Sequence, residues 1–242
     1  MKPIKFRFSR AEIKRHSICP SDWHRFVRRR EFELIASCFY PWRPSNAIEL
    51  GAGDGAQSET ISKYVERLTC TELLEEGNIG FGGRFVARNL ENVSYEICDA
   101  MNLEKFEAGS FDFVFSSNML EHVSNVDACL AECARVLKKG GLMVHVTPSR
   151  DWKFFNYVCT LAKGGRPLVH GVSNGDFQEF LEFGESRWLK KLEKRKFKVE
   201  ALARMPFYIG LGPTFLQLII FGNWLGFKSS TAYFCRLETD EA

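Results

Sequence analysis

Three glycines at alternate positions directly follow a short hydrophobic run near residue 50. The stretch is Ile48-Glu49-Leu50-Gly51-Ala52-Gly53-Asp54-Gly55. Glycine lets the main chain turn sharply and approach a bound molecule closely, because it has no Cβ. A helix is expected to begin near Ala56, so that backbone N–H groups and the positive end of the helix dipole face the loop. The pattern predicts a site for a nucleotide-like ligand, with an ordinary tight turn as the alternative.

Acidic side chains end the next two predicted strands. Glu72 lies 17 residues beyond Gly55, where a carboxylate can accept both hydroxyl protons of a ribose. Asp99 follows the third strand, where it could accept a hydrogen bond from an exocyclic amine while Met101 packs on a purine face. The fourth strand opens into residues 116–123. Since open α/β sheets bind ligands at the carboxyl ends of their strands, these residues indicate one shared site.

The order of segments along the chain predicts an α/β fold. From Asn46 onward, apolar runs of strand length alternate with helix-like segments, which is typical of a mostly parallel sheet covered on both faces. Strands are predicted at residues 46–50, 68–72, 93–97, 111–116, 142–147, 197–203 and 231–237. A helix is predicted after Val123, because four apolar residues recur there at helical spacing: Val126, Leu130, Cys133 and Leu137. An amphipathic N-terminal helix is expected over 21–39.

In combination, these motifs resemble the class I S-adenosylmethionine-dependent methyltransferases, over roughly residues 45 to 150. The resemblance is carried by Glu49, Gly51, Gly53, Gly55, Glu72, Asp99-Ala100, residues 118–123 and residues 135–141. It implies a Rossmann-like, doubly wound seven-stranded sheet in the order 3-2-1-4-5-7-6, with the last strand antiparallel. It also implies S-adenosylmethionine as the cofactor and S-adenosylhomocysteine as the product.

The same resemblance implies a set of cofactor contacts. The glycine loop would hold the methionyl part, Glu72 the ribose, and Asp99 with its two successors the adenine, while residues 116–118 would line the floor near the sulfonium. The cofactor-binding residues expected on this basis are Glu49, Gly51, Ala52, Gly53, Gly55, Glu72, Leu73, Asp99, Ala100, Met101, Ser116, Asn118 and Met119.

A dinucleotide is the rival cofactor. Gly51-x-Gly53-x-x-Ala56 also satisfies a relaxed dinucleotide fingerprint, and Glu72 could serve NAD equally well. The position of Glu49 inside the strand, together with the motifs at Asp99 and at residues 120–122, favours a methyltransferase over an NAD-dependent oxidoreductase.

Two histidines are candidates for a catalytic base. Methyl transfer from a sulfonium mainly requires alignment of a nucleophile and exclusion of water, but a hydroxyl acceptor would benefit from a base. His122 follows the fourth strand, and His170 lies in the expected substrate region; either could serve, because histidine titrates in the useful range. His122 could instead orient its loop, and His145 lies within a strand and is interpreted as structural.

The acceptor is less well defined by the sequence. The fourth strand ends in Ser116-Ser117-Asn118-Met119, which lacks the signature of amino-methylating DNA enzymes. The Leu120-Glu121-His122-Val123 motif resembles methyltransferases that act on small molecules, so a saccharide, a quinone precursor or a lipid-linked envelope metabolite is expected. The alternative function is a cofactor-binding or partner-binding protein that keeps the fold without transfer activity.

Charge and cysteine usage restrict the remaining classes. The net charge is +3, and residues 1–30 carry ten Lys/Arg against two acidic residues, which suggests either an arm attracted to an anionic partner or a solvated, partly disordered leader. A nucleic acid is the least favoured of these partners. The eight cysteines form no Cys-x-x-Cys pair, so neither a bound metal nor a disulfide framework is expected. No secretory signal is recognised, and a cytoplasmic location is expected.

One uncharged segment suggests contact with a membrane. Residues 205–227 contain no charged side chain, but glycines, Pro213 and polar residues break the segment into pieces too short to span a bilayer. A buried helix, or a peripheral contact at the inner face of a membrane, is expected instead.

One domain is predicted over 1–242, with a basic N-terminal arm and helix (1–45), a cofactor-binding core (46–147), a substrate-region insertion or lid (148–196) and C-terminal strands (197–242). The sequence indicates no oligomeric state.

Overall fold

The computed structural model describes residues 2–16, 20–74, 89–209 and 215–237, with the backbone alone for 20–22. Its strands are β1 Ile4–Lys5, β2 Ala47–Leu50, β3 Leu68–Glu72, β4 Val93–Ile97, β5 Phe111–Ser117, β6 Leu137–Pro148, β7 Phe197–Arg204 and β8 Ser230–Leu237. Its helices are α1 Arg10–His16, α2 Pro20–Ala36, α3 Ser58–Ile61, the 3-10 turn η1 Leu120–His122, α4 Val126–Val136, α5 Arg150–Ala162, α6 Asp176–Glu182, α7 Glu185–Lys194 and α8 Leu216–Leu225.

The strands form one mixed sheet in the order β1-β7-β8-β6-β5-β2-β3-β4. Strand β8 runs antiparallel to both β6 and β7, and the remaining neighbours pair in parallel. When strands β2 to β8 are numbered 1 to 7 in chain order, the sheet read from β4 to β7 has the expected order 3-2-1-4-5-7-6, and the antiparallel strand is the last one, β8. The predicted number of seven strands was wrong by one for the described residues, because the N-terminal β1 pairs with β7 at the edge of the sheet.

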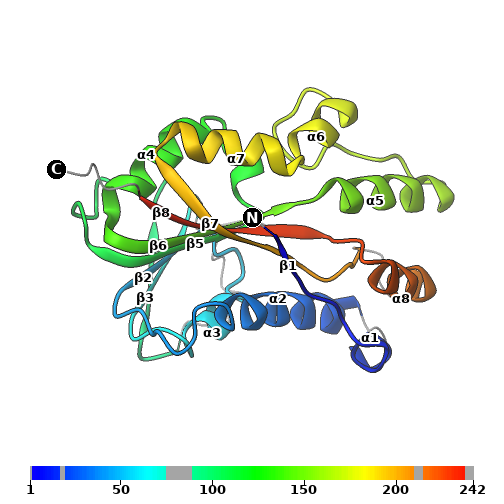
Figure 1. Ribbon diagram of the computed structural model, residues 1–242, viewed down its shortest axis with the longest axis horizontal. Helices are drawn as coiled ribbons and strands as arrows, with labels where there is room; N and C mark the ends of the chain where they lie inside the picture. Colours follow the sequence, from blue (N-terminus) through cyan, green and yellow to red (C-terminus); the bar gives the residue numbers. More distant parts are fainter. Residues whose placement is uncertain (1, 17–19, 75–88, 210–214, 238–242) are drawn as a thin grey trace.

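Helices cover both faces of the sheet, as expected for a doubly wound fold. Helices α2 and α3 lie on one face, and α4 and α7 lie on the other, while α5, α6 and α8 gather at one end (Figure 1). Helix α4 forms because Cys129, Leu130, Cys133 and Val136 recur at helical spacing and are fully buried. The side chain of Asn125 caps this helix by accepting from the N–H of Ala128 at 3.1 Å.

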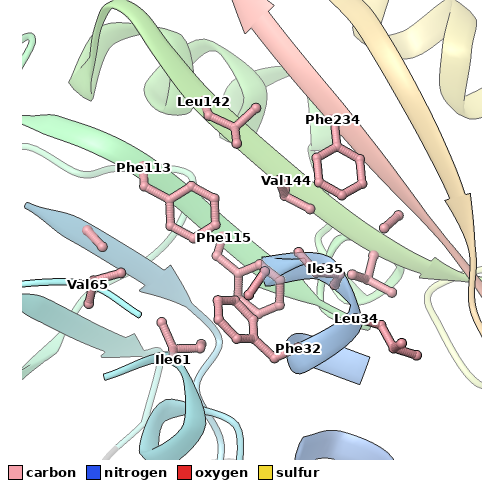
Figure 2. Close-up of a cluster of buried hydrophobic side chains, with 14 of the residues drawn as sticks. Phe32, Leu34, Ile35, Ile61, Val65, Phe113, Phe115, Leu142, Val144 and Phe234 are labelled. Atoms are coloured by element: carbon pink, nitrogen blue, oxygen red, sulfur yellow. The ribbon is translucent and has the colours of Figure 1, made fainter. Parts of the chain in front are cut away.

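The N-terminal segment is packed against the sheet rather than forming a loose arm. On helix α2, Phe32 and Ile35 are fully buried, and the Phe32 ring meets Phe115 of β5 edge to face at 5.0 Å between centroids. Figure 2 shows this cluster, in which the helix side chains pack against the sheet. Burial of each such side chain contributes roughly 1.5–3 kcal/mol. The cluster therefore fixes α2 beside the carboxyl end of β5.

Two local expectations needed correction. The helix expected near Ala56 is a single turn, α3, which begins only at Ser58. The helix after Val123 ends at Val136, so Leu137 begins β6 instead of ending the helix. The interpretation of His145 as structural fits its burial. The side chain is 1% exposed, its Nδ1 lies 2.5 Å from the Ser116 hydroxyl, and burial lowers its pKa to about 3.

Candidate active site

The loop after β2 turns back on itself through glycines in the left-handed region. Gly51, Gly53 and Gly55 have φ angles of +70°, +58° and +78°. A Cβ on Gly51 would come within 2.6 Å of the Met119 Cγ atom, whereas a Cβ on Gly53 would meet nothing within 4 Å. The loop therefore packs tightly against the segment after β5 on one side and leaves open space over Gly53 on the other.

Glu72 fixes this glycine loop from the end of β3. One carboxylate oxygen accepts from the N–H of Gly53 at 2.9 Å, and the other accepts from the N–H of Leu73 at 2.9 Å. Burial raises the pKa of Glu72, and these two N–H groups oppose that rise. Among the described residues each carboxylate oxygen accepts one backbone N–H, and an oxygen with two lone pairs can also accept from a ligand hydroxyl.

Glu49 supports the loop from below. It is 2% exposed, and its Oε2 accepts from the Ser58 hydroxyl at 2.5 Å and from the Cys70 thiol at 3.6 Å. Burial raises the pKa of Glu49 to about 8. The structure thus gives Glu49 a role beneath the loop, and direct contact with a cofactor stays a prediction.

Replacing Glu49 with Gln should stabilise the protein at pH 8. The pKa of the Glu49 carboxyl is raised from 4.5 to about 8 on folding, so between these pH values the folded protein holds a proton that the unfolded chain has released. The free energy of unfolding therefore falls as the pH rises from about 4.5 toward 8. The amide is neutral throughout and should raise the free energy of unfolding at pH 8 by about 1–3 kcal/mol. Urea unfolding at pH 5 and pH 8 measures this, and an equal effect at both pH values would contradict it.

Asp99 shapes its own turn at the end of β4. Its Oδ1 accepts from the N–H of Met101 at 2.8 Å, and its carbonyl oxygen accepts from the N–H of Asn102 at 2.8 Å. Ala100 and Met101 are half-buried beside it. The structure leaves the expected adenine contact of these residues as a prediction.

The residues that end β5 differ in where their side chains point. The fully buried Ser116 hydroxyl faces His145, so only its backbone is left for a ligand. Asn118 has a left-handed φ of +49°. When the Asn118 amide is oriented with its oxygen toward Arg28, that oxygen accepts from Nη1 and Nη2 of Arg28 at 2.5 and 2.7 Å.

Arg28 and Glu31 of helix α2 were missed by sequence reasoning. Glu31 is 2% exposed and accepts from Arg28, from the Ser117 hydroxyl at 2.9 Å and from the Gln57 amide at 2.9 Å. This network ties α2 to β5 and to the start of α3. The signal that could have found it is two charged residues three apart on the otherwise apolar face of a helix.

The two histidines predicted as bases lie together, beside a buried carboxylate. The rings of His122 and His170 are 4.8 Å apart between centroids, and the Glu121 Oε1 atom lies 3.6 Å from the Nε2 of His170. Glu121 is 7% exposed, and both of its oxygens are buried without a hydrogen-bond partner among the described residues. Burial lowers the pKa of His122. The charge of Glu121 opposes this fall in the pKa of His122.

Three donor atoms of this cluster, from Glu121, His122 and His170, lie within 4.8 Å of one another. That spacing could also hold a divalent cation. The expectation that no metal is bound stays a prediction.

The loop that carries His170 is held by a buried ion pair that the sequence did not indicate. Glu179 of α6 is fully buried, and its Oε1 accepts from the N–H groups of His170 and Gly171 at 2.6 Å each. Lys153 of α5 lies 2.5 Å from the other Glu179 oxygen. Burial opposes the charge of Lys153, but its hydrogen bonds to Asp176 and Glu179 raise its pKa. The pair therefore positions His170.

The His170 loop also docks directly on η1. The N–H of Val172 donates to the carbonyl oxygen of Glu121 at 3.1 Å, and a Cβ on Gly171 would come within 2.3 Å of the same oxygen. Since η1 follows Met119, which contacts Gly51, the glycine loop and the histidine cluster are neighbours.

Comparison with known proteins agrees with this arrangement. Residues 48–145 match a family model described as a methyltransferase domain. A ubiquinone biosynthesis O-methyltransferase from Agrobacterium fabrum is 28% identical over 150 residues, covering 62% of this chain and 55% of that protein. One from Caulobacter sp. is 29% identical over 168 residues, covering 67% and 65%. The chain therefore spans less than two thirds of the length of these relatives.

Solved structures show the same fold. A S-adenosylmethionine-dependent methyltransferase from Mesorhizobium loti superimposes with a TM-score of 0.58 at 17% identity, covering 85% of this chain and 97% of that one. Residues 48–145 carry a methyltransferase domain, and the sheet order and the glycine loop are those expected for a class I S-adenosylmethionine-dependent methyltransferase.

Proposed function

We propose that this protein transfers a methyl group from S-adenosylmethionine to a hydroxyl of a small amphiphilic acceptor, such as a quinone precursor or a lipid-linked saccharide. The observation that carries the proposal is the contact of the glycine loop with Met119, since the Glu121, His122 and His170 cluster begins two residues further on. A cofactor loop and a base thus share one edge of the sheet, where α/β enzymes bind ligands.

The described residues fit S-adenosylmethionine. The open space over Gly53 leaves room for a ligand against the backbone, and Glu72 retains acceptor capacity for a ribose. We assign the methionyl part to the glycine loop, the ribose to Glu72 and the adenine to residues 99–101. The bound cofactor supplies an activated methyl group.

The chain's own residues would then handle the acceptor proton. The neutral imidazole of His170 accepts the proton from the acceptor hydroxyl, and the Glu121 carboxylate at 3.6 Å stabilises the imidazolium that forms. The Glu179 contacts keep the His170 backbone in place, while the Trp152 ring, 5.0 Å from that of His170, covers it on one side. The O-methyltransferase names of the curated relatives support a hydroxyl acceptor.

Release of S-adenosylhomocysteine tests this proposal. The full chain is incubated with S-adenosylmethionine and either the lipid fraction or the aqueous fraction of a bacterial cell extract. We expect product with the lipid fraction, and unchanged rates after treatment with EDTA. Cofactor binding without release from either fraction would instead favour the inactive, ligand-binding alternative. Loss of activity in EDTA that Mg²⁺ restores would contradict the expectation that no metal is required.

A further inference from the structure

Helix α5 presents an apolar stripe to solvent. Phe154, Tyr157, Val158 and Leu161 recur at positions i, i+3, i+4 and i+7 and are 53%, 38%, 44% and 51% exposed. This spacing ordinarily marks the face of a helix that packs on the protein core. Here the core is contacted by the opposite side, where Cys159 is buried and the Phe155 ring meets that of Phe207 edge to face at 5.1 Å between centroids. The outer face of α5 therefore stays largely exposed among the described residues, beside α6.

Exposed aromatic residues also occur on two further helices, α6 and α8. Phe177 of α6 is 75% exposed and lines a hollow together with Phe154 and Tyr157. On α8, Phe221, Trp224 and Leu225 are 51%, 70% and 47% exposed, whereas Ile219 and Asn223 face inward. Helices α5, α6 and α8 lie at the same end of the molecule (Figure 1). We call this surface the apolar end; it comprises Phe154, Tyr157, Val158, Leu161, Phe177, Phe221, Trp224 and Leu225.

Cationic side chains flank the apolar end. Helix α1 packs against α8 and exposes Arg10, Lys14 and Arg15. At the other side, Lys163 lies over the Phe215 ring at 5.5 Å, and Arg166 is exposed nearby in the chain. The acidic Glu12 of α1 accepts from the N–H of Ser9 and pairs with Arg30. An exposed aromatic surface bordered by cations complements the interface of an anionic bilayer.

The apolar end is also continuous with the candidate active site. Helix α5 begins beside Trp152, whose ring contacts His170, and the same loop exposes Leu168 at 80% and Val172 at 58%. None of the described helices is long and apolar enough to cross a membrane.

We propose that the apolar end docks the protein on the surface of an anionic phospholipid membrane. Tyr157 and Trp224 suit this position, because their amphipathic rings favour the boundary between headgroups and acyl chains. Docking would place the His170 loop toward the bilayer, where a lipid-linked acceptor is held. That last step rests on the proposed function, whereas the docking itself does not.

Flotation of the full chain with vesicles tests the docking. Vesicles of phosphatidylcholine with one quarter phosphatidylglycerol should carry the wild type upward, and pure phosphatidylcholine should carry less. The Phe221→Ala/Trp224→Ala variant should lose about tenfold or more in partitioning, because two large apolar side chains no longer enter the interface. Lys14→Glu/Arg15→Glu should lose binding to the anionic vesicles only. Tyr40→Ala, 77% exposed beyond the far end of α2, should bind like the wild type.

Absence of flotation with both vesicle types would overturn the proposal. Equal vesicle binding by the Phe221→Ala/Trp224→Ala and Tyr40→Ala variants would also overturn it. So would a wild type that binds no vesicles but forms a dimer in analytical ultracentrifugation, if the Phe221→Ala/Trp224→Ala substitutions dissociate that dimer. Thermal unfolding and S-adenosylmethionine titration check that each variant is folded. Flotation without methyl transfer would leave the docking intact and count against the proposed function alone.

Discussion

Replacing His170 with Ala should lower the turnover number for methyl transfer by about 100-fold or more while the affinity for S-adenosylmethionine stays the same. A positioned general base contributes roughly 100- to 10,000-fold to a rate, and His170 is the histidine beside the unpartnered Glu121 carboxylate. Glu121→Gln should produce a smaller loss, because the base remains while its counter-charge is removed. The measurement is S-adenosylhomocysteine release with the lipid fraction at saturating cofactor.

Two further results separate catalysis from folding in this prediction. His16→Ala, which removes a histidine stacked on Phe26 away from the cluster, should leave turnover unchanged. Glu121→Gln should likewise leave the affinity for S-adenosylmethionine unchanged while it lowers turnover, because its carboxylate lies beside His170. Full activity of the His170→Ala variant would exclude the assigned role.

Replacing Gly51 with Ala should weaken S-adenosylmethionine binding by about 100-fold or more. The new Cβ would lie 2.6 Å from the Met119 Cγ atom, so the loop and the segment after β5 must separate. A non-glycine residue at a φ of +70° also costs about 1–3 kcal/mol of strain. Together these effects displace the backbone N–H groups that are assigned to the cofactor.

Gly109→Ala is the matched control for this substitution. Gly109 has a similar φ of +64°, but its Cβ would meet nothing within 4 Å. Both variants should therefore lose stability to backbone strain in urea unfolding, with a larger loss for Gly51→Ala because of its clash with Met119, while only Gly51→Ala should lose cofactor affinity in calorimetry. Equal affinity in the two variants would show that the contact between Gly51 and Met119 does not shape the binding loop.

Local patterns were sufficient to predict most of the sheet. The predicted strand at 93–97 matches β4 in both limits, and 111–116 matches β5 to within one residue. Buried strands such as β5 give nearly continuous apolar runs, which are easily recognised, whereas β4 lies at the edge of the sheet with most of its side chains exposed. The ends of helices were predicted less well. Helix α3 ends after one turn, and α4 ends at Val136, although the spacing of Leu137 also fits the apolar face of that helix.

The site was predictable only where its residues follow a strand end. Glu72, Asp99 and residues 118–122 could be placed because their strands converge at one edge of the sheet. The partners of His170 could not be placed in this way: Glu179 and Lys153 reach its loop from two separate helices, and Arg28 reaches Asn118 from a helix that precedes the sheet. These contacts depend on tertiary packing across many residues of chain.

The outward face of α5 is a further case. Its apolar spacing is the same as that of a buried helix, so the sequence alone could not indicate that Phe154 and Leu161 face solvent. The sequence instead suggested membrane contact for the uncharged segment 205–227, and within that segment Phe207 and Ile209 are fully buried. The division of the chain into one domain with an insertion at 148–196 stays a prediction.

Calorimetric titration of the full chain with S-adenosylmethionine, S-adenosylhomocysteine and NAD⁺ tests the central claim most directly. We predict that both S-adenosyl compounds bind with one-to-one stoichiometry and that NAD⁺ produces no binding heat. Glu72→Ala should weaken the binding of both S-adenosyl compounds about tenfold or more, since a hydrogen bond to a charged group contributes about 1.5–3 kcal/mol. Binding of NAD⁺ without binding of S-adenosylmethionine would contradict the assignment of the glycine loop.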